Sequence, residues 1–525
     1  MQTATLNLNR GAFNWCLANA HAAMDAGDDE SAAIWLSIAC ESASDFAPFG
    51  ELASAELEEI ACRIARRLPV PAPRDYVHPP WRWMHVVTEV YPVFGHSALI
   101  RRWIEQDDSS CIHDIVATGQ GPAFPDSLQA AVARTGGEVT CLDRTLPELA
   151  RASLLRQAAW EKADVIVVHT HPFDIIPTLA FGVAGGPPAL LVNHADHVFW
   201  PGASVADLVV NIRPSGRRLA EDCRGTGNGA MLPIPLPRPP QPGNGEPQGS
   251  LRQAARAQFQ IPSGAIVFLT IAQPYKYEPA AGLDYFAAAE RILRACHDAY
   301  VIAVGLPNTG RASALAVSTQ GRFRAVGTQR DIASYHAAAD IYLESIPVGS
   351  LTALLEASLA GLPCVRAPQA TPPTLCADGE ALDDDPRPVD LAHYVESAIA
   401  LARCDDASRR HTGSILADHI RDCHCGAGWT ARLEALRLQV PNQHAAPSKI
   451  SPKPMPDAMT DFWVRVVDAT PRPTLSLVMA VALRRSLPPL APIGVELWKQ
   501  VQRTNIHAIS KVMLTLHAIC PLVGL

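Results

Sequence analysis

The sequence predicts an α/β protein with two Rossmann-like lobes, an N-terminal helical domain and a mainly helical C-terminal extension. Three observations lead to this fold class. Short apolar runs alternate with amphipathic stretches over residues 80–235, the same alternation returns over 250–435, and a proline- and glycine-rich segment at 233–249 separates the two. Strands that alternate with helices of this length form βαβ units and parallel sheets. We expect the ligand cleft between the lobes, at the carboxyl ends of the strands.

The N-terminal helical domain is expected over residues 1–75. Its alanine-rich stretches carry apolar residues at helical spacing. Two apolar stripes are expected to face a core: Trp15, Ala18 and Ala22, then Ala33, Leu36 and Ala39. The proline-rich run at 68–74 ends this domain as a linker. A helical unit of this kind is a packing or docking module, and we expect no catalysis there.

Apolar runs give the strands of both lobes, which right-handed crossovers should connect. In the first lobe the expected strands are Met84–Thr88, Ile112–Thr118, Glu138–Leu142, Val165–His169, Ala189–Asn193 and Leu208–Ile212. In the second lobe they are Ala265–Ile271, Tyr300–Val304, Phe323–Val326, Ile341–Leu343 and Pro363–Arg366.

The extension at 445–525 opens with a proline-, serine- and lysine-containing linker and continues with apolar residues and a modest basic excess. We expect helices that pack on the main body. The alternative is a segment that contacts a membrane surface or a partner protein.

Composition narrows the function classes. The chain has 525 residues, of which 48% are hydrophobic and 18% charged, with a formal net charge of −8. A general nucleic-acid binder would carry a basic surplus, so we expect no nucleic-acid partner. Thirteen cysteines without paired spacing favour a reducing compartment. The N-terminus lacks a secretory pattern and no apolar run reaches the roughly 18 residues of a membrane span. We expect a cytoplasmic protein, at most peripheral to the inner face of the membrane.

The stretch from Asp340 to Val365 carries the clearest chemistry. A short strand runs into a proline–glycine loop, and a helix then starts at Ser350 or Leu351. This arrangement aims backbone N–H groups and the helix dipole at the cleft, where a diphosphate would bind. Thr352 adds a hydroxyl donor, and the Glu356 carboxylate, one turn deeper, could accept hydrogen bonds from a ribose. The alternative is a plain helix cap with a surface glutamate.

This stretch resembles the donor-binding segment of group 1-like GT-B glycosyltransferases. The resemblance lies in the order of Pro347, Gly349, Ser350, Thr352, Glu356, Gly361, Pro363 and Val365. Many retaining members carry a second glutamate eight positions before the first, and here that position is Val348. The segment is closer to the variant of peptide O-glycosyltransferases. The resemblance implies a hexosyltransferase-like enzyme that uses a nucleotide-diphosphate sugar, without a metal or other cofactor.

Two further loops of the second lobe match the same family. After its first strand, Gln273 and Lys276 stand where these enzymes place a polar loop and a cation against the donor diphosphate. A fixed cation there would stabilise the leaving phosphate. The loop with Gly327 and Thr328 is similar to the one that holds the nucleotide base.

The first lobe supplies the expected reaction centre and acceptor contacts. His96 follows the first strand, in the position of a glycine-rich loop of the family, and His171 ends a D-V-I-V-V-H-T-H pattern. The resemblance makes these the catalytic candidates, since a histidine can act as a base near neutral pH. His169 is expected to be a buried, hydrogen-bonded strand-end residue. Acceptor or sugar contacts are assigned to His194, Asp196, His197 and Arg213.

The leading hypothesis is therefore sugar transfer to a glycan, lipid or protein acceptor, with the acceptor on the first lobe and the donor on the second. Two alternatives stay open. One is a nucleotide-sugar epimerase, which would need more carboxylates in the first lobe. The other is a catalytically inactive scaffold or docking protein. The sugar, the base, the acceptor, the stereochemical outcome and the oligomeric state stay open as well.

Overall fold

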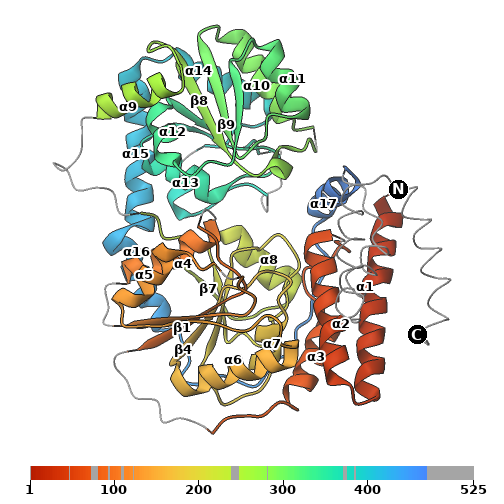
Figure 1. The fold of residues 1–525 in the computed structure, drawn as a ribbon. Helices are drawn as coiled ribbons and strands as arrows, with labels where there is room; N and C mark the ends of the chain where they lie inside the picture. The colour runs from red at the N-terminus through yellow and green to blue at the C-terminus, as the bar shows by residue number, and fades with distance from the viewer. Residues whose placement is uncertain are drawn as a thin grey trace.

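The computed structural model describes residues 2–46, 48–72, 81–92, 95–107, 111–121, 123–237, 248–280, 282–369, 375–383 and 386–469. It contains two α/β lobes and a bundle of N-terminal helices beside the first lobe (Figure 1). The predicted fold class is confirmed. Of the predicted C-terminal extension, 470–525 lies outside the described residues, as does 238–247 of the interlobe segment.

The first lobe is a seven-stranded sheet in the order β3-β2-β1-β4-β5-β6-β7, and its paired strands all run parallel. Its strands are β1 (Arg82–Val87), β2 (Ile112–Ala117), β3 (Val139–Cys141), β4 (Val165–Val168), β5 (Ala189–Asn193), β6 (Leu208–Asn211) and β7 (Gly229–Met231). Its helices are α4 (Gly95–Gln106), α5 (Asp126–Arg134), α6 (Glu148–Lys162), α7 (Ile176–Phe181) and α8 (Pro214–Arg224). The six predicted strands are present, and β7 is an edge strand that the sequence did not predict.

The second lobe repeats this design with a five-stranded parallel sheet in the order β10-β9-β8-β11-β12. Its strands are β8 (Ile266–Ile271), β9 (Ala299–Val304), β10 (Phe323–Gly327), β11 (Ile341–Leu343) and β12 (Cys364–Val365). Its helices are α9 (Gln248–Gln258), α10 (Tyr285–Ala295), α11 (Gly310–Ser318), α12 (Ile332–Ala338), α13 (Leu351–Leu359) and α14 (Leu391–Arg403), with 3₁₀ turns η2 (Pro274–Tyr277) and η3 (Glu380–Leu382).

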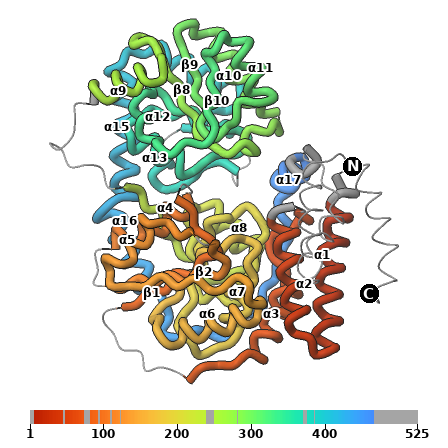
Figure 2. Tube along the Cα trace, viewed as in Figure 1, coloured from red at the N-terminus to blue at the C-terminus, as the bar shows by residue number. Residues whose placement is uncertain are grey.

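Two helices cross from the second lobe back to the first (Figures 1 and 2). They are α15 (Asp406–His424) and α16 (Gly426–Arg437). The prediction placed residues up to 435 in the second lobe, but Trp429 and Leu433 of α16 are buried in the core of the first. The indole N–H of Trp429 donates to the carbonyl of Pro233 at 2.7 Å. Burying these apolar side chains fixes α16 to the first lobe.

The N-terminal helices are α1 (Gln2–Asp25), α2 (Asp29–Glu41) and α3 (Ala55–Ala65), with a short π-helical turn, η1 (Ser42–Phe46). The stripe of Ala33, Leu36 and Ala39 is buried, as predicted. The predicted stripe on α1 is wrong: Trp15, Ala18 and Ala22 are exposed. The buried face of α1 consists of Ala12, Phe13, Cys16, Leu17, Ala20 and Met24. Because α1 is alanine-rich, apolar residues recur on several of its faces and spacing alone could not choose the core face.

Buried charged groups attach this bundle to the first lobe. The Glu58 carboxylate of α3 accepts hydrogen bonds from the backbone N–H groups of Gly202, Ala203 and Ser204 at 2.6–3.3 Å. On the other side, the Arg156 guanidinium of α6 donates to five backbone carbonyls, among them that of Ala65 at the end of α3. Satisfied buried charges of this kind tie the two units together, because breaking either one leaves polar groups unpaired.

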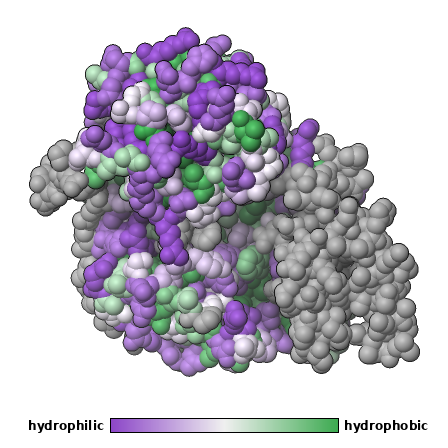
Figure 3. Space-filling model, turned by 45° about the horizontal axis from the view of Figure 1, so that its top comes forward, coloured by the Kyte–Doolittle hydropathy of each residue, from purple (hydrophilic) through white to green (hydrophobic). Residues whose placement is uncertain are grey.

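The last described helix, α17 (Asp457–Ala469), lies beside the N-terminal bundle (Figure 1). The chain reaches it along the first lobe, where the N–H of Lys453 donates to the carbonyl of Cys223 at 2.9 Å, and then past the N-terminal unit, where the N–H of Met455 donates to the carbonyl of Gly50 at 2.8 Å. Met459 and Phe462 of α17 share a buried apolar cluster with Leu219 of the first lobe and Val348 of the second. The packing prediction for the extension is thus met by its described part. Figure 3 shows a largely hydrophilic second-lobe surface above this region.

Replacing Glu58 with alanine should lower the free energy of unfolding by about 2–4 kcal/mol, because three backbone N–H groups of one loop lose a shared acceptor. Urea unfolding measures this change. Glu59→Ala, on the exposed face of the same helix, is the matched control and should change stability by less than about 0.5 kcal/mol. Equal losses in the two variants would contradict the attachment described here.

Candidate functional site

The site is set by the points at which the strand order reverses. In the first lobe this point lies between β1 and β4, and in the second between β8 and β11. The segments that follow these four strands carry His96, in the first turn of α4, His171, Lys276, in η2, and Ser350. Doubly wound sheets bind ligands at such points, outside the carboxyl ends of the strands. The sequence-predicted residues therefore belong to the expected edge of each sheet.

On the second lobe, Lys276 meets the loop before α13. Its Nζ donates to the carbonyl of Gly349 at 2.8 Å. Burial lowers the pKa of Lys276 to about 8, and the nearby Arg213 guanidinium contributes in the same direction, while Glu344 and Asp196 oppose the shift. An ammonium group held close to another cation favours an anionic ligand, which would restore its charged form.

Gly349 has a packing requirement that explains its place in the motif. A Cβ at this position would lie 2.2 Å from Oε1 of Glu344 and 2.8 Å from the nitrogen of Ala377. The Glu344 carboxylate in turn accepts hydrogen bonds from the N–H groups of Ala367 and Ala377, at 2.7 and 3.0 Å. Glu344 therefore orders the loops around the helix start, and only glycine fits against it.

The N-terminus of α13 meets the N-terminus of α4 across the cleft. Ser350 is the N-cap of α13 and makes no side-chain capping hydrogen bond. A Cβ on Gly95, the first residue of α4, would lie 3.7 Å from Oγ1 of Thr352. Two helix starts, from different lobes, thus point their positive dipole ends at one region together with Lys276. Leu351 and Thr352 supply the first backbone amides of α13 for an anion placed there.

Glu356 has a partner that the sequence did not predict. Nη2 of Arg102, on α4, donates to its Oε1 at 2.5 Å, so this ion pair joins the two lobes. The ribose contact expected of Glu356 stays a prediction. Arg102 and Glu356 are 254 positions apart in the chain, and no spacing rule relates them.

The remaining donor-side residues lie on neighbouring loops. Gly327 ends β10 with a positive φ of 65°. Its N–H donates to the carbonyl of Leu306 at 2.9 Å, and its own carbonyl accepts from the N–H of Gly305 at 2.7 Å. Thr328 and Gln273 are exposed. The carbonyl of Gln273 accepts from the backbone N–H of Lys276 at 3.1 Å. The roles of these three residues in binding base and diphosphate stay predictions.

The first lobe brings three imidazoles together. The ring centroid of His96 lies 4.5 Å from that of His194 and 5.7 Å from that of His171. Nε2 of His96 lies 2.5 Å from the carbonyl oxygen of His169, and Nδ1 of His194 lies 3.2 Å from that of Val192. A carbonyl only accepts, so these two nitrogens carry the hydrogens. The other ring nitrogen of each residue, Nδ1 of His96 and Nε2 of His194, is then a bare acceptor.

Burial keeps this cluster neutral. It holds the pKa of His96 well below 6.5, with further lowering by the neighbouring His194 and His171. Burial lowers the pKa of His194 to about 4. The pKa of His171 is also lowered by burial, against the opposing effect of Asp174 and Glu89. Neutral imidazoles can accept a proton at neutral pH, as a general base must.

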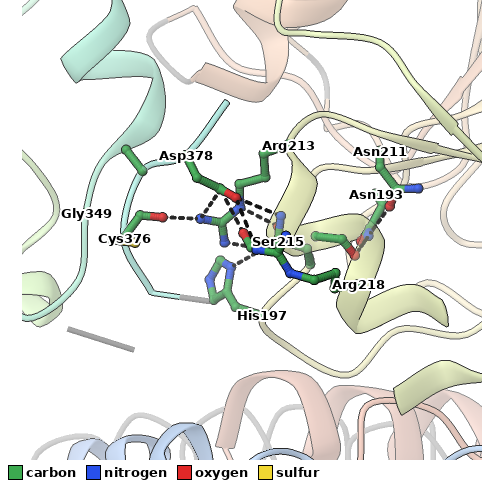
Figure 4. Close-up of polar contacts among 12 residues, drawn as sticks. Asn193, His197, Asn211, Arg213, Ser215, Arg218, Gly349, Cys376 and Asp378 are labelled. Carbon is green, nitrogen blue, oxygen red and sulfur yellow. Dashed lines mark hydrogen bonds and ion pairs between the residues drawn. The ribbon is translucent and has the colours of Figure 1, made fainter. Parts of the chain in front are cut away.

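The predicted acceptor contacts form a charged junction between the lobes (Figure 4). Arg213 binds Asp196 through Nε and Nη2, at 2.5 and 2.7 Å, and donates from Nη1 to the Cys376 carbonyl of the second lobe at 2.6 Å. The Asp378 carboxylate accepts from the backbone N–H and the hydroxyl of Ser215, both at 2.8 Å, and so caps α8 from the other lobe. The sequence did not indicate Asp378. These contacts give Arg213 and Asp196 a structural role, and their contact with an acceptor stays a prediction.

His197 connects the junction to the C-terminal helix. Its Nδ1 lies 3.2 Å from Oδ1 of Asp196. On its other side, the indole of Trp463 stacks on the His197 ring, with centroids 5.7 Å apart and planes at 8°. Trp463 also lies 6.3 Å from the ring of Tyr275, next to Lys276. The extension therefore borders the site, although its sequence carries no motif that would show this.

The described part of the chain offers neither a metal site nor a membrane-spanning helix. Within the described residues, no group of three or more histidine, cysteine, aspartate or glutamate side chains could hold a metal ion. No helix in the same part of the chain is long and apolar enough to cross a membrane.

Several solved structures resemble this chain. The O-GlcNAc transferase of Thermobaculum terrenum, solved as a point mutant, is 17% identical, with a TM-score of 0.49 over 89% of this chain and 83% of that one. A glycosyltransferase from Rickettsia africae is 13% identical, with a TM-score of 0.49 over 69% and 98%. WaaG, a glycosyltransferase involved in lipopolysaccharide biosynthesis, is 12% identical, with a TM-score of 0.44 over 68% and 99%. No family model and no curated protein matches the sequence. The two-lobed GT-B fold rests on the strand orders and crossing helices described above.

Stability should fall as the pH is lowered through the histidine range. The folded-state pKa values of His194 and His424 are lowered to about 4 from 6.5, so below about pH 6.5 the unfolded chain binds more protons than the native one. Stability present above pH 6.5 is therefore lost between about 6.5 and 4. Urea unfolding at a series of pH values measures the slope. His194→Gln should flatten it, whereas His411→Gln, at an exposed position, should not; identical slopes in the two variants would contradict the argument.

Proposed function

We propose that this protein is a glycosyltransferase that moves a sugar from a nucleoside-diphosphate donor to an acceptor hydroxyl. The observation that carries the proposal is the meeting of Lys276 and the start of α13 with the start of α4 and the imidazoles of His96 and His171. A cation and two helix N-termini suit a diphosphate, and neutral imidazoles suit proton removal. The two kinds of chemistry stand on opposite lobes of one cleft.

The donor half follows from charge. As the bond between sugar and diphosphate breaks, negative charge grows on the leaving phosphate. Lys276 and the first amides of α13 lie where they can stabilise that charge without moving far, since Gly349 and Glu344 already order the loop. An ammonium whose pKa is lowered to about 8 becomes fully charged when a phosphate binds, so donor binding and protonation of Lys276 support each other.

The proposed activation of the acceptor rests on the imidazole nitrogens that carry no hydrogen. With Nε2 of His96 donating to the His169 carbonyl, Nδ1 of His96 is free to take the proton of an attacking hydroxyl. The hydroxyl oxygen then forms the new bond to the anomeric carbon, and the nucleoside diphosphate leaves with the electrons of the old one. His171, 5.7 Å from His96 between ring centroids, is proposed to contact the donor sugar or to share the role of base.

The two alternative functions, an epimerase and an inactive scaffold, have less support. An epimerase would need acidic groups beside the reacting sugar, but the first-lobe carboxylates Asp174 and Asp196 are occupied with Thr88 and with Arg213. An inactive scaffold would not need an ordered loop around a half-buried lysine. Nucleotide binding separates the scaffold from the enzyme, because a scaffold should bind neither UDP nor GDP.

Lys276→Ala should weaken the binding of UDP or GDP by about 10- to 100-fold, the loss of one charge-assisted contact to phosphate. Isothermal titration calorimetry measures the affinity. Lys449→Ala removes an exposed lysine of the segment that follows α16 and should leave affinity unchanged. Equal affinities in wild type and Lys276→Ala, or no binding of either nucleotide to the wild type, would overturn the proposal.

His96→Gln should slow the release of nucleoside diphosphate by about 100-fold or more, as expected for loss of a general base. Its affinity for the nucleotide should stay within about twofold of wild type, because the His96 imidazole is not among the groups proposed to hold the diphosphate. A donor screen that detects released diphosphate gives the rate, and His411→Gln is the control. A wild-type rate in His96→Gln would exclude it as the base.

A further inference from the structure

A row of hydrogen-bonded imidazoles lies beneath the cluster of His96, His171 and His194. His113 on β2, His85 on β1 and His169 after β4 belong to neighbouring strands, and each is two residues further along the sheet than the one before. Side chains two residues apart share a face of the sheet. Nδ1 of His113 lies 3.0 Å from Nε2 of His85, and Nδ1 of His85 lies 3.0 Å from Nε2 of His169. All three residues are buried.

The far end of the row is a carboxylate. Oδ2 of Asp107, just after α4, lies 3.1 Å from Nε2 of His113, and Arg437 of α16 forms an ion pair with the same oxygen. The Asp107 side chain has no exposed surface. An arginine partner favours the ionised form of a carboxyl group. Asp107 is therefore an acceptor, and Nε2 of His113 must donate to it.

This constraint fixes every tautomer along the row when the three imidazoles are neutral, the state that burial favours for His85 and His169. A neutral imidazole has one N–H and one bare nitrogen, so His113 is bare at Nδ1 and must accept from Nε2 of His85. His85 is then bare at Nδ1 and accepts from Nε2 of His169. The last member, His169, is left bare at Nδ1. That atom is buried and has no hydrogen-bond partner among the described residues.

The His169 end of the row lies next to the proposed site. The ring centroid of His169 lies 6.3 Å from that of His96, and the two groups interact electrostatically. In a neutral imidazole the bare nitrogen is the negative end of the dipole. Three such dipoles lie head to tail here, each with its negative end toward His96, and the Asp107 charge stands behind them. Fixed dipoles of this kind stabilise positive charge in a water-poor site.

We propose that this row stabilises the positive charge that forms on His96 when it takes a proton, and that His169, His85, His113 and Asp107 are positioning residues. The inference rests on the proposed function. The proton passes from the acceptor hydroxyl to Nδ1 of His96 and stays there, and the row transfers none. The other titratable groups that face His96 are His171, after β4, and His194, after β5, and neither supplies a negative charge.

The first test is of the tautomers and needs no nucleotide. The protein is labelled with ¹⁵N-histidine, and His169→Gln identifies the His169 signals. Nδ1 of His169 should show the shift of a bare, pyridine-type nitrogen near neutral pH, and Nε2 that of an N–H nitrogen. An N–H at Nδ1 would overturn the row. This outcome is independent of whether the protein binds a donor.

The second test is kinetic. Asp107→Asn removes the charge behind the row and should lower the rate of diphosphate release about 3- to 10-fold. It should also move the acid limb of the pH–rate profile to lower pH by about 0.6–0.8 unit, the effect of one charge roughly 15–20 Å away at an effective dielectric constant near 20. Affinity for UDP or GDP should not change. Glu105→Gln removes an exposed charge from the same region of α4 and is the matched control.

Arg437→Gln keeps the test decisive if Asp107→Asn fails to fold. It removes a positive charge at the Asp107 end of the row, where Asp107→Asn removes a negative one. Removal of this cation should move the acid limb to higher pH. No displacement of the limb in either variant, or the same displacement in Glu105→Gln, would overturn the inference even if donor binding and dependence on Lys276 hold. Absence of nucleotide binding by the wild type would instead remove the proposed function, and the tautomer result would still decide whether the row exists.

Discussion

The arrangement of the two lobes depends on the hydrogen bonds of the Arg213 guanidinium. This group binds Asp196 with two hydrogen bonds inside the first lobe and reaches a carbonyl of the second, that of Cys376. A buried guanidinium must keep its donors satisfied, so moving the lobes apart would leave charge and N–H groups unpaired. The capping of α8 by Asp378 and the pairing of Arg102 with Glu356 add two further polar contacts between the lobes. These contacts hold the strand ends of one lobe opposite those of the other.

The facing strand ends divide the chemistry between them. The second lobe contributes positive charge, from Lys276 and the start of α13, on loops ordered by Glu344. The first lobe contributes imidazoles that burial and mutual repulsion keep neutral. A cation on one side and proton acceptors on the other are the two requirements for attack by a hydroxyl and departure of a phosphate. The proposed transfer therefore needs groups from both lobes.

Much of the fold could be predicted because local sequence patterns determine it. Apolar runs separated by amphipathic helices predict β1, β4, β8 and β11. The order of the motifs after these strands puts His171 and Lys276 at the points where the strand order of each sheet reverses. The core face of α1 could not be read, because alanine is compatible with either face. The edge strand β7 consists of a glycine, an alanine and a methionine, so it leaves no apolar run of the kind that marked the other strands.

The interlobe contacts and the imidazole row could not be predicted for a different reason. Arg102 and Glu356, or Ser215 and Asp378, come from positions so distant in the chain that only the assembled fold relates them. His85, His113 and His169 each look like an ordinary buried strand residue. Their connection depends on the register between three strands. Trp463 follows a linker with no motif, and only packing places it against His197.

A crystal structure with UDP or GDP bound tests the central claim most directly. The account predicts the diphosphate between Nζ of Lys276 and the first backbone amides of α13, with phosphate oxygens within about 3 Å of these donors and the imidazole of His96 across the cleft from it. A nucleotide bound elsewhere, with Lys276 still joined to the carbonyl of Gly349 and no phosphate at the start of α13, would contradict it.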